Sequence, residues 1–87
     1  MYVVLVYDVG ERRVGKICKY LRTELTWVQN SVFEGELSES RFSRLQSRLD
    51  ELINEEEDSV LVYVISSEKW IHREVMGIER NERSNLL

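Results

Sequence analysis

Two uninterrupted apolar segments constrain the fold of this chain more than any other feature. Residues 2–7 (YVVLVY) and 60–65 (VLVYVI) consist of β-branched, aromatic and aliphatic side chains, and no charged or amide residue interrupts either run. Runs of this kind are typical of strands that are covered on both faces. Both segments are therefore predicted to be central strands of one sheet.

The segments between these runs alternate between helical and extended patterns. Residues 12–25 and residues 39 to about 56 place apolar side chains on one face at helical spacing, with Ser38 as the N-cap of the second helix. Residues 27–37 are rich in β-forming residues and are interrupted by Asn30-Ser31, which predicts two strands or one bent pair. Residues 70–78 are expected to hold one more short strand.

The predicted order is β-α-β-β-α-β, the ferredoxin-like order of an α+β fold, with a short C-terminal strand extension. The 87 residues suffice for one domain, assigned to residues 1–78, with residues 79–87 as a tail that crosses to or packs on a dimer partner. Two helices cover only one face of such a sheet. A second copy, packed sheet to sheet about a two-fold axis, would cover the other face, so a homodimer is predicted.

Composition narrows the setting in which the protein works. Cys18 is the single cysteine, so no disulfide forms within the chain, and a reducing cytoplasm is expected. No segment is long enough to span a membrane, and residues 1–7 lack the flanks of a signal peptide, so no membrane partner is expected. The net charge of −4 argues weakly against nucleic acid, which makes the local distribution of charge more informative than the total.

Asp8 is the first candidate functional residue, because it lies where an apolar strand ends and a helix is about to begin. A carboxylate in that position is held rigidly and reaches solvent, so it could bind a hard cation such as Mg²⁺. The alternative is that Asp8 caps the turn or the helix that follows. One aspartate is a poor magnesium site, but a two-fold axis near the strand end would bring two copies of Asp8 together around one metal.

A basic row on the first helix is the second candidate. The row contains Arg12, Arg13, Lys16, Lys19 and Arg22, and no acidic residue occurs from position 12 to position 22. Such a row is suited to contacts with phosphate groups, although a merely solvated helix face would look the same. A second row on the later helix, formed by Arg41, Arg44 and Arg48, is a weaker candidate because acidic neighbours can pair with it.

Three segments together resemble the CRISPR-associated protein 2 family, the small subunit of the CRISPR spacer-acquisition complex. Residues 2–9 (YVVLVYDV) are similar to the opening strand of that family, and residues 28–35 (VQNSVFEG) resemble its most recognisable internal motif. Residues 58–63 (DSVLVY) resemble its last core strand. The three matches occur in the right order over nearly the whole chain, so their combination is far more specific than any one of them.

The resemblance implies a ferredoxin-like homodimer with Asp8 at its interface as a ligand of Mg²⁺ or another divalent cation such as Mn²⁺. Members of the family are described as metal-dependent endonucleases acting on RNA or double-stranded DNA, and as bridges between integrase dimers of CRISPR-associated protein 1. Arg12, Arg13 and Lys16 match the basic start of the family's first helix, and Ser31 and Phe33 match motif residues near the aspartate. The chain departs from the family at Trp27, where many members carry arginine.

Three functional hypotheses follow from the sequence. The first is a Mg²⁺-dependent phosphodiesterase with Asp8 as catalytic residue and metal ligand. The second is a dimeric scaffold that clamps DNA through the first helix and bridges integrase dimers without catalysis. The third is a ferredoxin-like regulatory domain with a ligand between its subunits, which the fold alone permits; no glycine-rich ligand loop supports it.

Overall fold

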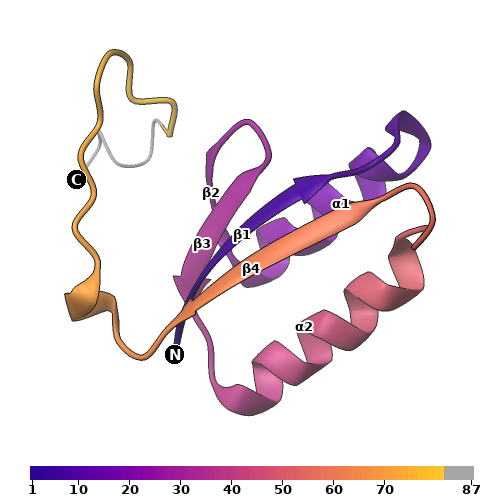
Figure 1. The fold of residues 1–87 in the computed structure, drawn as a ribbon, viewed down its shortest axis with the longest axis horizontal. Coiled ribbons are helices and arrows are strands. Elements are labelled where there is room, and N and C mark those ends of the chain that lie inside the picture. The colour runs from indigo at the N-terminus through magenta and orange to yellow at the C-terminus, as the bar shows by residue number, and fades with distance from the viewer. Residues whose placement is uncertain (82–87) are drawn as a thin grey trace.

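The computed structural model describes residues 1–81 and shows two helices packed on a four-stranded antiparallel sheet (Figure 1). The elements in chain order are β1 (Tyr2–Asp8), α1 (Glu11–Glu24), β2 (Thr26–Gln29), β3 (Val32–Glu36), α2 (Glu39–Leu52), β4 (Ser59–Ile65) and a 3₁₀ turn, η1 (Glu68–Trp70).

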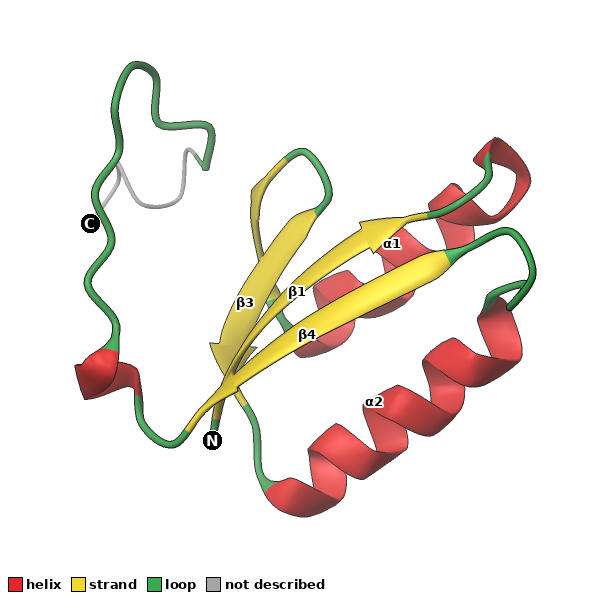
Figure 2. Ribbon diagram, viewed as in Figure 1, coloured by secondary structure: helices red, strands yellow, loops and turns green. Residues whose placement is uncertain are grey.

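The strands lie in the order β2-β3-β1-β4, and each neighbouring pair is antiparallel. Both helices lie on the same side of this sheet (Figure 2). This arrangement is the ferredoxin-like fold, as the sequence predicts. The expected break at residues 30–31 is the turn between β2 and β3, where Asn30 has a positive φ of 42°, a conformation that asparagine tolerates better than most residues.

The core fills the space between the sheet and the helices. In β1, Val3 and Leu5 are fully buried and point toward the helices, and Tyr7 continues the same row. These side chains meet Ile17 of α1 and Leu45 of α2, each at a position that the helical spacing of apolar residues predicts. The buried apolar residues are Val3, Leu5, Tyr7, Ile17, Leu21, Leu25, Phe33, Leu37, Leu45 and Leu49.

Within residues 1–81, the opposite face of the sheet carries no helix. Val4 of β1 is paired in register with Tyr63 of β4, and Val6 with Leu61, so these side chains share the open face. Tyr63 is 56% exposed and Leu61 is 50% exposed, which is unusual for large apolar side chains on a sheet. The homodimer remains a prediction, and this open apolar face is the physical reason for it.

β4 differs from its predicted place, because in the described part of the chain it lies at the edge of the sheet and pairs only with β1. The apolar run at 60–65 places apolar side chains on both faces of the strand. Val60 and Val62 pack against the core, and Leu61 and Tyr63 lie on the open face. Cover on two faces does not require a strand neighbour on each edge, so the inference of a central position was wrong.

The second helix is also shorter than predicted, ending at Leu52 rather than near residue 56. The chain turns there because the carboxylate of Asp58 accepts a hydrogen bond from the Asn54 N–H at 2.8 Å. The Asn54 carbonyl in turn accepts from the N–H groups of Glu57 and Asp58, which closes the turn. The acidic residues 55–58 thus belong to the connection between α2 and β4 and do not form the last turn of the helix.

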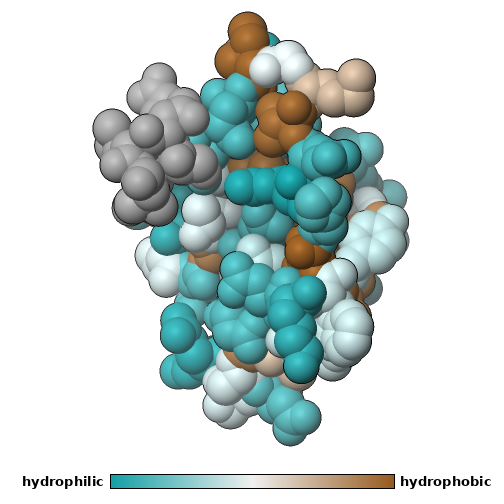
Figure 3. Space-filling view, turned by 90° about the vertical axis from the view of Figure 1, so that its left-hand side faces the viewer, coloured by the Kyte–Doolittle hydropathy of each residue, from teal (hydrophilic) through white to brown (hydrophobic). Residues whose placement is uncertain are grey.

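The C-terminal segment contains η1 and no strand up to residue 81, so the short strand predicted at 70–78 is absent there; residues 82–87 of the predicted tail lie outside the described residues. The Arg73 guanidinium donates to the Glu34 carboxylate at 2.6 Å, and the Asn81 amide donates to the Trp27 carbonyl. Seen from the side that lies at the left of Figure 1, the molecular surface is mostly hydrophilic with separate apolar patches (Figure 3).

Candidate metal site and nucleic-acid interface

Asp8 is the last residue of β1, and it lies opposite Ser59 of β4 in the strand register. Strand alternation puts its side chain on the same face as Val4 and Val6, which is the open face of the sheet. Asp8 is exposed, whereas its neighbour Tyr7 is buried on the helix side. The carboxylate is therefore presented at the end of a strand, on the sheet face that neither helix covers.

Ser31 and Phe33, the two motif residues expected near Asp8, lie at the same end of the sheet but have different contacts. The Ser31 carbonyl accepts a hydrogen bond from the Tyr7 N–H at 3.1 Å, which ties the β2–β3 turn to the strand end beside Asp8. Phe33 is fully buried, and its ring centroid lies 6.3 Å from that of Tyr7. Phe33 thus supports the strand from within the core and is not accessible to a substrate.

Tyr7 itself is not available as an acid or base near neutral pH. Its hydroxyl lies 2.7 Å from the Sγ of Cys18, and burial, together with this contact, raises the pKa of Tyr7 to about 12. Cys18, predicted to be a small buried residue, is half-buried against the core and serves as this partner. The titratable group that remains exposed at the strand end is the Asp8 carboxylate.

Within one chain Asp8 cannot complete a metal site. No group of three or more histidine, cysteine, aspartate or glutamate side chains able to hold a metal occurs in residues 1–81. Mg²⁺ commonly takes one or two carboxylates and keeps several waters. Two copies of the chain paired through the open face would supply two Asp8 carboxylates, and that number fits this donor set.

The basic row on α1 divides into three parts: an outer stripe, Arg13, and Arg22, which is exposed in the last turn of the helix. Arg12, Lys16 and Lys19 are exposed, and none of the three makes an ion pair with another residue of the described chain. They recur at helical spacing on the side of α1 directly opposite Ile17 and Leu21, which face the core. These three cations form the outer stripe of α1.

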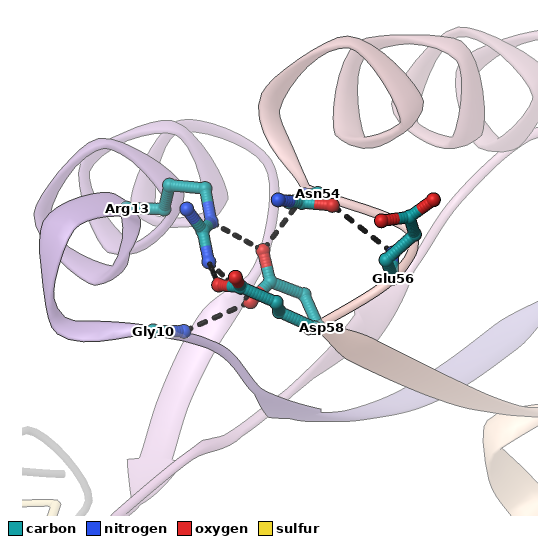
Figure 4. Close-up of polar contacts among 6 residues, drawn as sticks. Gly10, Arg13, Asn54, Glu56 and Asp58 are labelled. Atoms are coloured by element: carbon teal, nitrogen blue, oxygen red, sulfur yellow. Dashed lines mark hydrogen bonds and ion pairs between the residues drawn. The ribbon is translucent and has the colours of Figure 1, made fainter.

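Arg13 belongs to a different cluster. Its Nε lies 2.5 Å from Asp58 Oδ2, its Nη2 lies 2.9 Å from Asp58 Oδ1, and the same Nη2 lies 2.9 Å from the Glu57 carboxylate (Figure 4). The side chain of Arg13 is 23% exposed, and that of Asp58 is 0% exposed. Arg13 therefore binds carboxylates of its own chain, whereas the sequence groups it with the phosphate-binding candidates.

Asp58 was missed as a candidate in the sequence because it is the last of four consecutive acidic residues. Its carboxylate accepts hydrogen bonds from Arg13, from the Asn54 N–H and from the Gly10 N–H, the last at 2.9 Å. These bonds, with Arg13 as the largest influence and burial opposing it, hold the pKa of Asp58 well below its usual range. The available signal was the resemblance of residues 58–60 to the family's last core strand.

The structure does not bring Asp8 and the outer stripe of α1 onto one surface. Asp8 lies on the open face of the sheet, and α1 packs on the other face with its basic side chains directed away from the sheet.

Trp27 packs against the core, and its Nε1 donates to the Asn30 carbonyl at 3.0 Å, so it is a structural residue. None of the described helices is long and apolar enough to cross a membrane.

Known proteins resemble this chain in both sequence and structure. The family model described as CRISPR associated protein Cas2 matches residues 1–73. Two proteins named "CRISPR-associated endoribonuclease Cas2" are similar over nearly their full length. The one from Dictyoglomus turgidum is 46% identical over 87 residues, which is 100% of both chains. The one from Thermotoga maritima is 51% identical over 82 residues, which is 94% of each.

Solved structures agree with these sequence matches. A crystal structure described as that of cas2 superposes with a TM-score of 0.85 at 44% identity, covering 92% of this chain and 90% of the other. The crystal structure of Streptococcus pyogenes Cas2 superposes with a TM-score of 0.78 at 29% identity, covering 88% of this chain and 100% of the other.

Proposed function

This chain belongs to the CRISPR-associated protein Cas2 family, and from that premise we propose that it is a metal-dependent endonuclease of CRISPR adaptation, hydrolysing phosphodiester bonds of RNA or double-stranded DNA. The observation that carries the proposal is the exposed Asp8 carboxylate at the end of β1, on a sheet face without a helix. The name of these relatives, endoribonuclease, supports the same reaction class.

The catalytic unit in this proposal is a homodimer formed through the open face. Two Asp8 carboxylates, one from each copy, would hold Mg²⁺ or Mn²⁺ between the subunits. A bound divalent cation of this kind activates water and neutralises the charge of a scissile phosphate. The chain contributes the rigidity: Ser31 anchors the strand end through Tyr7, and Phe33 supports Tyr7 from below.

The experiment compares cleavage of labelled RNA and of duplex DNA in Mg²⁺, in Mn²⁺ and in chelator. We expect Asp8→Ala to abolish cleavage and to remain dimeric by light scattering. Asp50→Ala, which removes an exposed aspartate from α2, is the matched control and should cleave like the parent protein. Equal cleavage by purified Asp8→Ala and parent protein would show that the site assignment is wrong.

A second function is favoured by the outer stripe of α1. Three exposed cations without partners in the described chain lie on the side of the molecule away from Asp8. That separation suits a dimeric scaffold that clamps double-stranded DNA by its phosphates and bridges integrase dimers of CRISPR-associated protein 1 during spacer acquisition. Binding and cleavage use different surfaces here, so one chain can perform both.

A further inference from the structure

The buried Asp58 carboxylate joins three segments that are distant in sequence. It accepts from Gly10 in the β1–α1 connection, from Arg13 in the first turn of α1, and from Asn54 after α2 (Figure 4). Asp58 directly precedes Ser59, the register partner of Asp8. The cluster thus lies at the same end of the sheet as the candidate metal ligand, although Asp58 itself is enclosed and cannot reach a substrate.

We infer that Asp58 is a positioning residue for Asp8. By binding the Gly10 N–H and the Arg13 guanidinium, it fixes the two residues, Val9 and Gly10, that connect the end of β1 at Asp8 to α1. The inference rests on the proposed function, because it deepens the account of how Asp8 is placed to bind a metal. Charged groups that orient a metal ligand from behind are a general requirement of metal sites.

The local structure shows why this connection needs an outside anchor. Gly10 is the N-cap of α1, and having no side chain it cannot form the usual cap hydrogen bond. Its carbonyl accepts from the N–H groups of Arg13 and Val14, so the backbone on the helix side is held. The Gly10 N–H, two residues after Asp8, is bound by Asp58, a residue 48 positions away.

Asp8 consequently lies between two fixed points. On its N-terminal side the Tyr7 N–H binds the Ser31 carbonyl at 3.1 Å. On its C-terminal side the Gly10 N–H binds Asp58 at 2.9 Å. Loss of the second anchor would free Val9 and Gly10 to move, and the Asp8 carboxylate would lose its fixed direction toward the open face.

A second ion pair between elements provides a control for general stability. Arg41 Nη2 lies 2.5 Å from the Glu24 carboxylate, and this pair joins the end of α1 to the start of α2. Glu24→Gln removes one carboxylate from a pair between elements, as Asp58→Asn does, but far along α1 from Gly10. An effect of Asp58→Asn that Glu24→Gln does not reproduce is therefore an effect on the Asp8 end.

The experiment measures the Mg²⁺ concentration that gives half-maximal cleavage, together with amide hydrogen exchange at Val9 and Gly10, in the full-length homodimer. We expect Asp58→Asn to raise the half-maximal Mg²⁺ concentration by about tenfold or more, as is usual when a residue supporting a metal ligand is changed. Asp58→Ala, which unlike asparagine keeps no acceptor oxygen for the Gly10 N–H, should make exchange at Gly10 faster. Glu24→Gln should lower the melting temperature without changing either quantity at the Asp8 end.

Gly10→Pro is the second variant, because it removes the N–H donor without substituting Asp58 or Asp8, and its ring Cδ takes the place of the hydrogen, which forces the Asp58 carboxylate away from residue 10. Gly10 has φ −64° and ψ 150°, angles that proline adopts. The added Cβ would lie 2.7 Å from Arg13 Nη2 and 3.8 Å from Asp58 Oδ1, so the tip of Arg13 must shift and its ion pair with Asp58 is disturbed as well. We expect this variant to shift the Mg²⁺ dependence in the same direction as Asp58→Asn. It decides the question if Asp58→Asn does not fold.

Two outcomes would overturn the inference. The first is a folded Asp58→Asn protein, or a folded Gly10→Pro protein, whose Mg²⁺ dependence equals that of the parent. The second is unchanged Gly10 exchange in a folded Asp58→Ala protein, a result that counts even if the parent protein shows no metal-dependent cleavage. Absence of cleavage in the parent would contradict the proposed endonuclease, so the two failures are distinguishable.

Discussion

Removal of the outer stripe of α1 should change the salt dependence of DNA binding by an amount that the structure sets. Arg12, Lys16 and Lys19 are exposed and without ion pairs in the described chain, so a homodimer would present two copies of each. If all bind phosphates, the slope of log K against log salt is about −5. Binding would then weaken about a thousandfold between about 50 mM and about 200 mM salt.

The double variant Lys16→Ala/Lys19→Ala leaves only Arg12 on each stripe. Its slope should flatten to about −2, and the same change in salt should weaken binding only about tenfold. Both lysines point away from the core, so the fold and the melting temperature should be preserved. Fluorescence anisotropy with a labelled duplex over a salt series measures the slope directly.

The matched control is Arg44→Ala/Arg48→Ala, which removes two exposed cations from α2. Arg48 already lies 3.8 Å from Glu51, an acidic neighbour of the kind that the outer stripe of α1 lacks. We expect this control to keep a slope close to that of the parent protein. Parallel slopes for the parent and the Lys16/Lys19 variant would refute the assignment of α1 as the phosphate-binding surface, whatever happens to the affinity at one salt concentration.

Three further predictions concern the dimer, the core and acid stability. Tyr63→Glu on the open face should halve the mass measured by light scattering. Val64→Glu is the control, because Val64 is similarly exposed but lies on the other side of β4, and this variant should stay dimeric. A dimeric Tyr63→Glu protein would contradict packing through this face. Phe33→Ala should lower the free energy of unfolding by about 3–5 kcal/mol in urea titrations, because it empties a fully buried site under Tyr7, and a loss well below 1 kcal/mol would contradict that role. The pKa of Asp58 is lower in the folded than in the unfolded chain, so its contribution to stability is present at neutral pH and is lost as pH falls below about 4; unfolding at several pH values should show this loss in the parent protein and not in Asp58→Asn.

Much of the fold could be predicted from the sequence because local pattern and burial agree. The spacing of Ile17 and Leu21 in α1, and of Leu45 and Leu49 in α2, identifies the helices and their buried faces. The continuous apolar runs identify β1 and β4 as strands, and the order of the elements then leaves few topologies. Asp8 was identified for the same reason, since a carboxylate directly after an apolar strand stands out in the sequence.

The sequence by itself determined the two helices, the strands β1 and β4, their order and the carboxylate that ends β1, because these follow from the periodicity of neighbouring side chains. It did not determine the end of α2, and it predicted a strand at 70–78 that is absent. It could not decide which face of β1 meets the helices, since Val3 and Leu5 are as apolar as Val4 and Val6. Tertiary structure decided that Asp8 and the outer stripe of α1 lie on opposite sides, and that β4 is an edge strand. It also paired Arg13 with Asp58 across 45 residues, a contact that depends on the path of the whole chain and leaves no local trace in the sequence.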